Sequence, residues 1–220
     1  MKKEAEVFFP EDAWNVLRKH FMESGGLFDQ IEHGRNIRVS LGDQPEDDQE
    51  LEEIKQALMS IHHSWEGMDA LPRWQVCLLW SVAPRLEVML RDTTEPLMVH
   101  ILHARLFTWI ELALSNTDQE RSSEYLMIHD IMIHMKGLKG FSTQLRFGSI
   151  DLDAFEELIQ AVNVLSLAWK EQSMVPRVGA WLLLLVPIQS WDAKVYKGEQ
   201  RKQLAEMRLR LYALIDECFC

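Results

Sequence analysis

The stretch YLMIHDIMIH, residues 125–134, is the apolar run from which the fold class can be predicted. Signals that start and end helices flank it on both sides. Thr117 and Glu120 form a T-x-x-E capping box before the run. Gly137 and Gly140 follow it, and glycine favours the end of a helix. The stretch therefore predicts a helix that carries histidines and an aspartate in an apolar setting.

Similar signals predict helices along most of the chain. Helices are predicted at 10–23, 95–115 and 153–170, and another starts within 43–53 and runs to about 64. A further helix is capped by Asp69, carries Pro72 in its first turn and should kink or split at Pro84. The last predicted helix starts at Ser190, and Gly198 is a point where it could be interrupted. Only Ile37, Val39 and Leu41 alternate like a strand, and a loop is an equal alternative for this short segment. The predicted class is all-α, an irregular bundle or α-α stack of about eight helices.

The chain is predicted to form a single all-helical domain over 1–220, with the connector 137–150 as an alternative boundary. The most apolar segment, VGAWLLLLVPI at 178–188, is shorter than the about twenty residues of a membrane span and is interpreted as a buried core helix. The first residues, MKKEAEVFFPED, contain no apolar core of a secretory signal. These features predict a soluble, cytoplasmic protein.

Three cysteines are present, an odd number without a regular spacing, which favours a reducing compartment. Cys77 lies in the apolar run VCLLW and is interpreted as a buried small apolar residue. Cys218 and Cys220 lie at the end of the chain, and the sequence assigns them no role.

The net charge is −11 and the pI is about 5.2. Such a charge repels nucleic acid phosphates and anionic membrane surfaces, and it speeds encounter with a basic partner. Much of it lies in one run, which we call the acidic segment: Asp43, Glu46, Asp47, Asp48, Glu50, Glu52 and Glu53. One interpretation is a solvated loop and helix start. The other is a docking patch for lysines and arginines.

The docking interpretation predicts a non-enzymatic acidic helical protein that binds a basic protein partner. Immunity proteins and antitoxins have this charge and shape, and adaptors or chaperones of a larger complex are the other option. No cofactor, nucleic acid or membrane is expected in this hypothesis.

The histidines support a second hypothesis. His100 and His103 share one face of a predicted helix, and Asp130 and His134 share a face of the next. Asp130 and His134, one turn apart, can simply pair with each other in a buried helix. Alternatively, the two helices bring imidazoles and a carboxylate to one locus.

In that alternative the chain resembles the HD phosphohydrolase superfamily. His100 or His103 in HILHARL and the doublet His129-Asp130 in IHDI match the family's pattern. The resemblance implies an all-helical enzyme whose divalent ion, such as Mn, Fe or Mg, activates water for attack on a phosphate ester. The family's final aspartate would be Asp192, or else Asp151 or Asp153.

Overall fold

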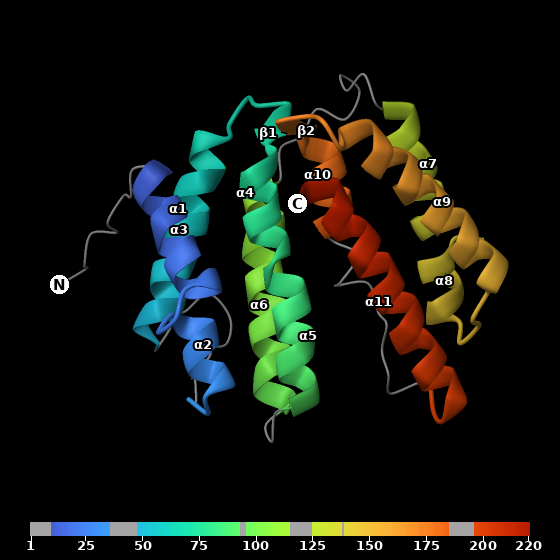
Figure 1. Ribbon diagram of the computed structural model, residues 1–220, viewed down its shortest axis with the longest axis horizontal. Helices are drawn as coiled ribbons and strands as arrows, with labels where there is room; N and C mark the ends of the chain where they lie inside the picture. The colour runs from blue at the N-terminus through green and yellow to red at the C-terminus, as the bar shows by residue number, and fades with distance from the viewer. Residues whose placement is uncertain (1–9, 36–47, 93–95, 115–124, 138, 185–195) are drawn as a thin grey trace. The chain divides into compact units, whose positions relative to one another are not determined.

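The computed structural model describes residues 10–35, 48–92, 96–114, 125–137, 139–184 and 196–220 (Figure 1). Helices make up most of these residues, so the predicted all-α class is confirmed. None of the described helices has both the length and the apolar character that crossing a membrane requires. Packing groups the chain into two compact units, Met1–Met68 with Leu78–Asn116 and Asp69–Cys77 with Thr117–Cys220. That the whole chain is a single domain stays a prediction.

The first unit is a helical layer in which α3 packs against both α1 and α6 (Figure 1). Its core holds tilted aromatic pairs, with ring centroids 5.6 Å apart for Trp14 and Trp65 and 5.3 Å apart for Phe21 and Phe28. The helices of this unit are α1 (Pro10–Met22), α2 (Leu27–Glu32), α3 (Gln49–Ser64), α5 (Val82–Asp92) and α6 (Pro96–Leu114).

The second unit has the same kind of core, with α9 packed against α7 and α11. The Trp169 ring stacks on that of Phe219 at a centroid distance of 6.1 Å. Its elements are β1 (Ala70–Pro72), α7 (Tyr125–Lys136), α8 (Phe141–Arg146), α9 (Leu152–Trp169), β2 (Met174–Pro176), α10 (Arg177–Leu184) and α11 (Glu199–Phe219). Helix α4 (Arg73–Trp80) begins in this unit, directly after β1.

Several predicted boundaries change in the structure. The helix expected to begin at Asp69 is wrong at its start, because residues 70–72 form β1 and α4 begins at Arg73. The connector 137–150 lies inside the second unit and contains α8. The break near Pro84 is confirmed, since α4 ends at Trp80 and α5 begins at Val82. The segment 37–41, predicted as a strand or a loop, and the Thr117–Glu120 capping box lie outside the described residues.

The strands β1 and β2 form an antiparallel ribbon with local twofold symmetry. Leu71 pairs with Val175 at its centre, and both are buried. The backbone N–H of Arg73 donates to the Ser173 carbonyl at 2.8 Å, and that of Arg177 donates to the Asp69 carbonyl at 2.9 Å. Each strand is thus extended by the same bond from the arginine that follows its proline.

The two halves of the chain repeat one order of elements. In the first, a helix, a six-residue helix and a long helix follow one another as α1, α2 and α3; in the second they are α7, α8 and α9. A strand and a short helix come next in each case, as β1 with α4 and β2 with α10. Long helices close the series, α6 in the first half and α11 in the second. Most of the positions that would correspond to α5 lie outside the described residues. The chain is therefore built from two copies of one half-fold.

Residues at corresponding positions support this repetition. The buried apolar positions of α3 and α9 coincide, from Leu51 and Phe155 to Ile61 and Leu165. The same side chain occurs in both copies at Glu52 and Glu156, Glu53 and Glu157, Gln56 and Gln160, Ala57 and Ala161, Trp65 and Trp169, Pro72 and Pro176, and Arg73 and Arg177. Buried positions of α6 and α11 likewise align, with Leu106 matching Leu211.

The short helices are entered alike in both copies. Gly26 and Gly140 are the N-cap residues of α2 and α8. A Cβ atom at Gly26 would lie 2.0 Å from the Lys19 carbonyl oxygen, and one at Gly140 would lie 2.7 Å from that of Met135. Only glycine therefore allows the chain to pass so close to the end of the preceding helix.

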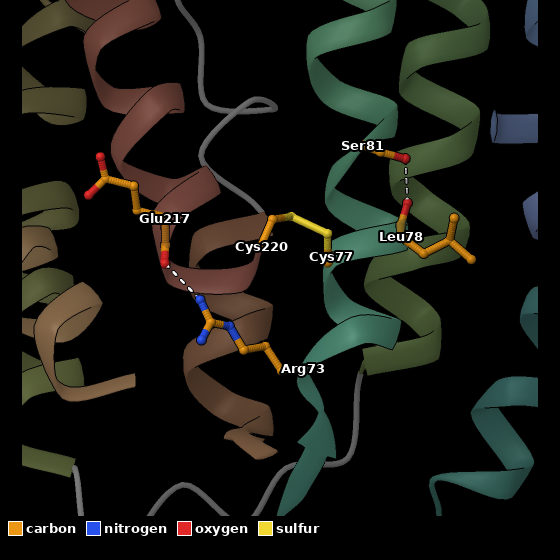
Figure 2. Close-up of a disulfide and its surroundings, with 6 residues drawn as sticks. All are labelled: Arg73, Cys77, Leu78, Ser81, Glu217 and Cys220. Carbon is orange, nitrogen blue, oxygen red and sulfur yellow. Dashed lines mark hydrogen bonds between the residues drawn. A yellow bond between two sulfur atoms is a disulfide. The ribbon is translucent and has the colours of Figure 1, made fainter. Parts of the chain in front are cut away.

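A disulfide joins Cys77 to Cys220 in the second unit, with the Cα atoms 5.4 Å apart (Figure 2). The interpretation of Cys77 as a buried small apolar residue is therefore wrong, because this cysteine is half-buried and forms a disulfide. Arg73, four residues before Cys77, also links the ends of α9 and α11. Its guanidinium donates to the carbonyls of Trp169, Lys170 and Glu217 at 3.1, 2.6 and 3.0 Å. These bonds satisfy carbonyls at the ends of α9 and α11 that no helical N–H reaches.

Cys218 is the free cysteine of the described residues, and it is fully buried. Burial raises the pKa of its thiol to about 12. The reactive form of cysteine is the thiolate, so burial holds Cys218 in the less reactive thiol form at neutral pH.

Candidate functional site: the acidic start of α3

The acidic segment leads into α3, and its described part carries the helix start. Asp48 is the N-cap residue, and its Oδ1 accepts from the N–H groups of Glu50 and Leu51 at 3.1 and 3.3 Å. Acids in the first helical turn also face the positive end of the helix dipole. Asp43, Glu46 and Asp47 lie outside the described residues.

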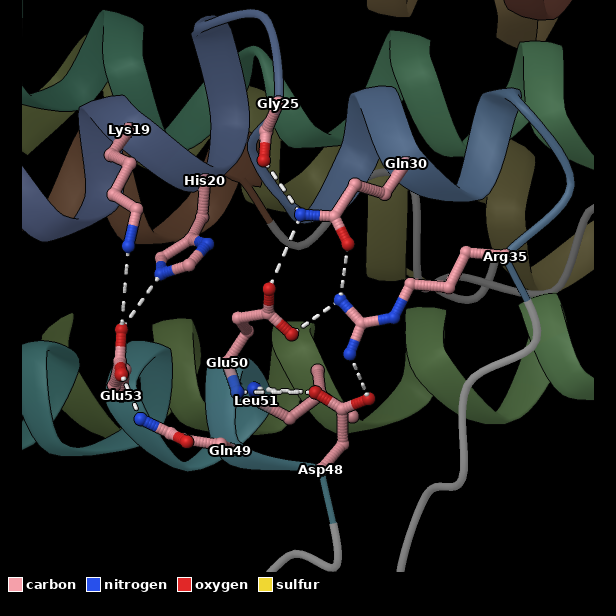
Figure 3. A network of polar contacts seen from close by, with 10 residues as sticks. All are labelled: Lys19, His20, Gly25, Gln30, Arg35, Asp48, Gln49, Glu50, Leu51 and Glu53. Carbon is pink, nitrogen blue, oxygen red and sulfur yellow. Dashed lines mark hydrogen bonds and ion pairs between the residues drawn. The ribbon is translucent and has the colours of Figure 1, made fainter.

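Arg35 holds two of these carboxylates (Figure 3). Its Nη2 lies 2.8 Å from Asp48 Oδ2, and its Nη1 pairs with Glu50. Gln30 completes the set by accepting from Arg35 at 2.6 Å and donating to Glu50 at 3.2 Å. Burial alone would raise the pKa of Glu50, but the hydrogen bonds from Arg35 and Gln30 hold it below its ordinary value. Glu50 is therefore an anion at neutral pH.

His20 anchors the next turn of α3 to α1. It is fully buried, and its Nε2 lies 3.2 Å from Glu53 Oε2. Lys19 lies 3.7 Å from the same oxygen, and Gln49 donates to Oε1 at 3.0 Å (Figure 3). Burial lowers the pKa of His20, and this outweighs the hydrogen bond and charge of Glu53, which raise it. The neutral imidazole is thus the form that the fold accommodates.

The buried His20 predicts a loss of stability in mild acid. Because its folded-state pKa lies below the ordinary 6.5, the unfolded chain binds the proton more readily. Stability is therefore full above pH 6.5 and declines as pH falls below it toward the folded-state pKa. The pKa values of Glu50 and Glu53, held below 4.5, add a further decline under pH 4.5. Urea unfolding midpoints between pH 7.5 and 5 would measure the first decline.

The substitution His20→Gln should remove the part of that decline that begins at pH 6.5. His33→Gln is the control, because its side chain is 77% exposed and lies on the same unit. A decline of equal size in the His20→Gln and native proteins would show that another group is responsible.

The second unit repeats this contact between a histidine of one helix and a glutamate of the next long helix. His134 of α7 corresponds to His20, and Glu157 of α9 corresponds to Glu53; His134 Nδ1 lies 3.3 Å from Glu157 Oε2. Asp130, one turn earlier on α7, lies 3.4 Å from His134 Nε2, so the predicted pair within the helix is present. The prediction that this polar face is buried is wrong, because His129 and Asp130 are exposed. His134 thus links two helices at the surface.

The other residues of the proposed metal set are distributed over both units. His100 and His103 lie on α6 of the first unit, where the His103 ring packs 4.7 Å from that of Phe107. His129 and Asp130 belong to the second unit, and Asp192 lies outside the described residues. Within the described part of the chain, no three acidic, histidine or cysteine side chains group so as to hold a metal ion. The phosphohydrolase interpretation stays a hypothesis without support from these residues.

Comparison of the chain with protein-family models, with curated proteins and with solved structures found no match. Sequence reasoning located the acids of the site but missed their partners Lys19, His20, Gln30 and Arg35, which precede the acidic segment. Their positions carry no local pattern, since only the packing of α1 on α3, and of α2 on α1, brings them to the carboxylates.

Proposed function

We propose that this chain is a non-enzymatic binding protein whose partner is a basic protein, in the manner of an immunity protein, an antitoxin or an adaptor. The observation that carries the proposal is its charge, with 34 acidic against 23 basic residues and a net charge of −11. Such a field accelerates encounter with a positively charged protein and disfavours nucleic acids and anionic membranes.

The acidic segment is the proposed contact surface. Asp48 is buried and serves the fold as the N-cap of α3. The side chains of Glu50, Glu52 and Glu53 keep 24, 31 and 30% of their surface exposed. Their contacts with Arg35, Lys55, Lys19 and His20 restrict their rotamers. A partner therefore loses less side-chain entropy on binding them than on binding freely rotating acids, and its cations must compete with Arg35, Lys55 and Lys19 for these carboxylates.

The proposed location is the cytoplasm. Disulfides in that compartment are in most cases transient or redox-sensing. A cytoplasmic location therefore makes Cys77–Cys220 a bond that the cell can reduce.

Charge reversal at two acids tests the proposed surface. Asp47→Lys with Glu52→Lys changes the acidic segment and leaves Asp48, Glu50 and Glu53 to hold the fold. The immobilised native chain is first used to capture a basic protein from a lysate of the source organism. We expect the immobilised variant to retain at least about tenfold less of that same protein. Quantitative mass spectrometry of the retained protein would measure the ratio.

The control is Glu66→Lys with Glu199→Lys, which changes the net charge equally at two exposed positions outside the segment. Equal losses in both variants would show that total charge, not this surface, governs binding. Undiminished retention by the Asp47→Lys and Glu52→Lys protein would remove the surface from the account.

A further inference from the structure

A groove of about 550 Å³ runs along the second unit between α9 and α11. Pockets that bind small molecules commonly have about 300–1,000 Å³. Ile159 and Leu214 supply apolar lining, and Asn163 and Glu217 lie on the two helices beyond them. Ile159 is 8% exposed, so it forms part of the unit's core as well as the groove wall.

The repetition of the half-fold shows that this groove is particular to the second unit's sequence. Leu214 of α11 corresponds to Trp109 of α6, and Ile159 of α9 corresponds to Lys55 of α3. Trp109 is 5% exposed, and the Lys55 ammonium lies 6.0 Å from the centre of its ring. The indole and the lysine thus occupy, in the first unit, the place that shorter side chains leave open in the second.

The charges of the groove do not cancel. At one end Arg210 pairs with Glu156 through both terminal guanidinium nitrogens, with Nη2 2.9 Å from Oε2. The hydrogen bond from Arg210 lowers the pKa of Glu156, so both groups are charged and neutralise each other. Glu217, at the other end, has no ion pair with any side chain that the structure describes. It therefore leaves one uncompensated negative charge beside an apolar wall.

The turn that carries Glu217 is held in place. Arg73 donates to the Glu217 carbonyl at 3.0 Å, and Cys220 follows in the disulfide with Cys77. Figure 2 shows the Glu217 carboxylate pointing away from the Arg73 guanidinium, which contacts Glu217 through its backbone carbonyl alone. The carboxylate thus stays available to a ligand on an immobilised helix end.

We propose that the α9–α11 groove binds a lysine or arginine side chain of a basic peptide segment. The aliphatic stem of that side chain lies along Ile159 and Leu214, and its cationic head pairs with the Glu217 carboxylate. Arg210 does not compete for Glu217, because it is already paired with Glu156. Asn163 offers an amide oxygen to the same head. This inference rests on the proposed function, because the segment belongs to the basic partner.

The test is an NMR titration of the full chain with a peptide of alternating lysine and alanine, acetylated only at its N-terminus so that the lysine side chains stay charged. The side-chain amide signals of Asn163 and Gln160, both lining residues, report on the groove directly. We expect saturable shifts of these signals, with affinity at least about tenfold lower in Glu217→Gln and in Leu214→Trp, which copies the first unit. Glu66→Gln, an equal charge change on the first unit, should bind as the native chain does.

Absence of shifts at Asn163 and Gln160 would overturn the groove proposal, and so would equal weakening in Glu66→Gln. Leu214→Trp tests whether filling the groove prevents binding. Glu217→Gln keeps the shape of the groove and removes its charge, so it still tests the proposal if the tryptophan disturbs folding. Shifts confined to α3 would reject the groove while leaving the proposed function standing. Capture of the partner that depends on neither Asp47 nor Glu52 would instead reject the proposed α3 surface.

Discussion

Replacing Trp169 with alanine should lower the free energy of unfolding by about 3–5 kcal/mol, the usual loss for a large aromatic side chain removed from a core. Trp169 is completely buried and stacks on Phe219. A Cβ atom at Gly179 would lie 2.5 Å from the edge of its ring, so α10 fits closely against the indole. The surroundings have little freedom to fill the space that alanine would leave. Urea unfolding followed by circular dichroism would measure the change.

Trp65→Ala should cost a similar amount, because Trp65 corresponds to Trp169 in the first unit and is 2% exposed. Trp74→Ala is the matched control, since that ring is 50% exposed, and its loss should stay below about 1 kcal/mol. Equal effects at Trp74 and Trp169 would contradict the assignment of Trp169 to the core.

Reduction of the Cys77–Cys220 disulfide should cost about 2–5 kcal/mol. The bond joins residues separated by 143 positions, so it restricts the unfolded chain over a long loop. The reduced corner keeps its hydrogen bonds from Arg73 and the β1–β2 ribbon, and these do not restrict the unfolded chain. Unfolding midpoints with and without a thiol reductant would measure the loss.

Cys77→Ser supplies the control for that experiment. The variant should be as unstable without reductant as the native chain is with it, and reductant should have no further effect on it. Native protein that is denatured without reductant should offer one reactive thiol, from Cys218, among its three cysteines. Three reactive thiols in that assay would contradict the disulfide.

Much of the fold follows from local signals in the sequence. The helix predicted at 10–23 is α1, and the one predicted at 153–170 is close to α9. In each case acids occupy the first turn, and apolar residues recur with a helical period. Such signals act within a few turns and are therefore visible in a single sequence.

Features that join distant parts of the chain could not be predicted in this way. The strands β1 and β2 have three residues each and contain Pro72 and Pro176, a composition that argues against a strand. Their pairing depends on a partner far along the chain. Cys77 meets Cys220 for the same reason, because α4 and the end of α11 approach only in the folded unit.

The candidate site shows the same division. The acids from Asp48 to Glu53 could be located from their density alone, but the buried His20 and the bridging Arg35 could not. A histidine on α1 has no sequence feature that marks it as the partner of Glu53. The corresponding pair, His134 and Glu157, becomes informative only once the two half-folds are aligned.

The salt dependence of association tests the central claim, binding driven by negative charge at the start of α3, most directly. The rate at which the native chain binds its captured partner should fall at least about tenfold between about 0.05 M and about 0.5 M salt. The Asp47→Lys and Glu52→Lys variant should associate slowly at both concentrations. A native association rate that is the same at both salt concentrations would contradict the account.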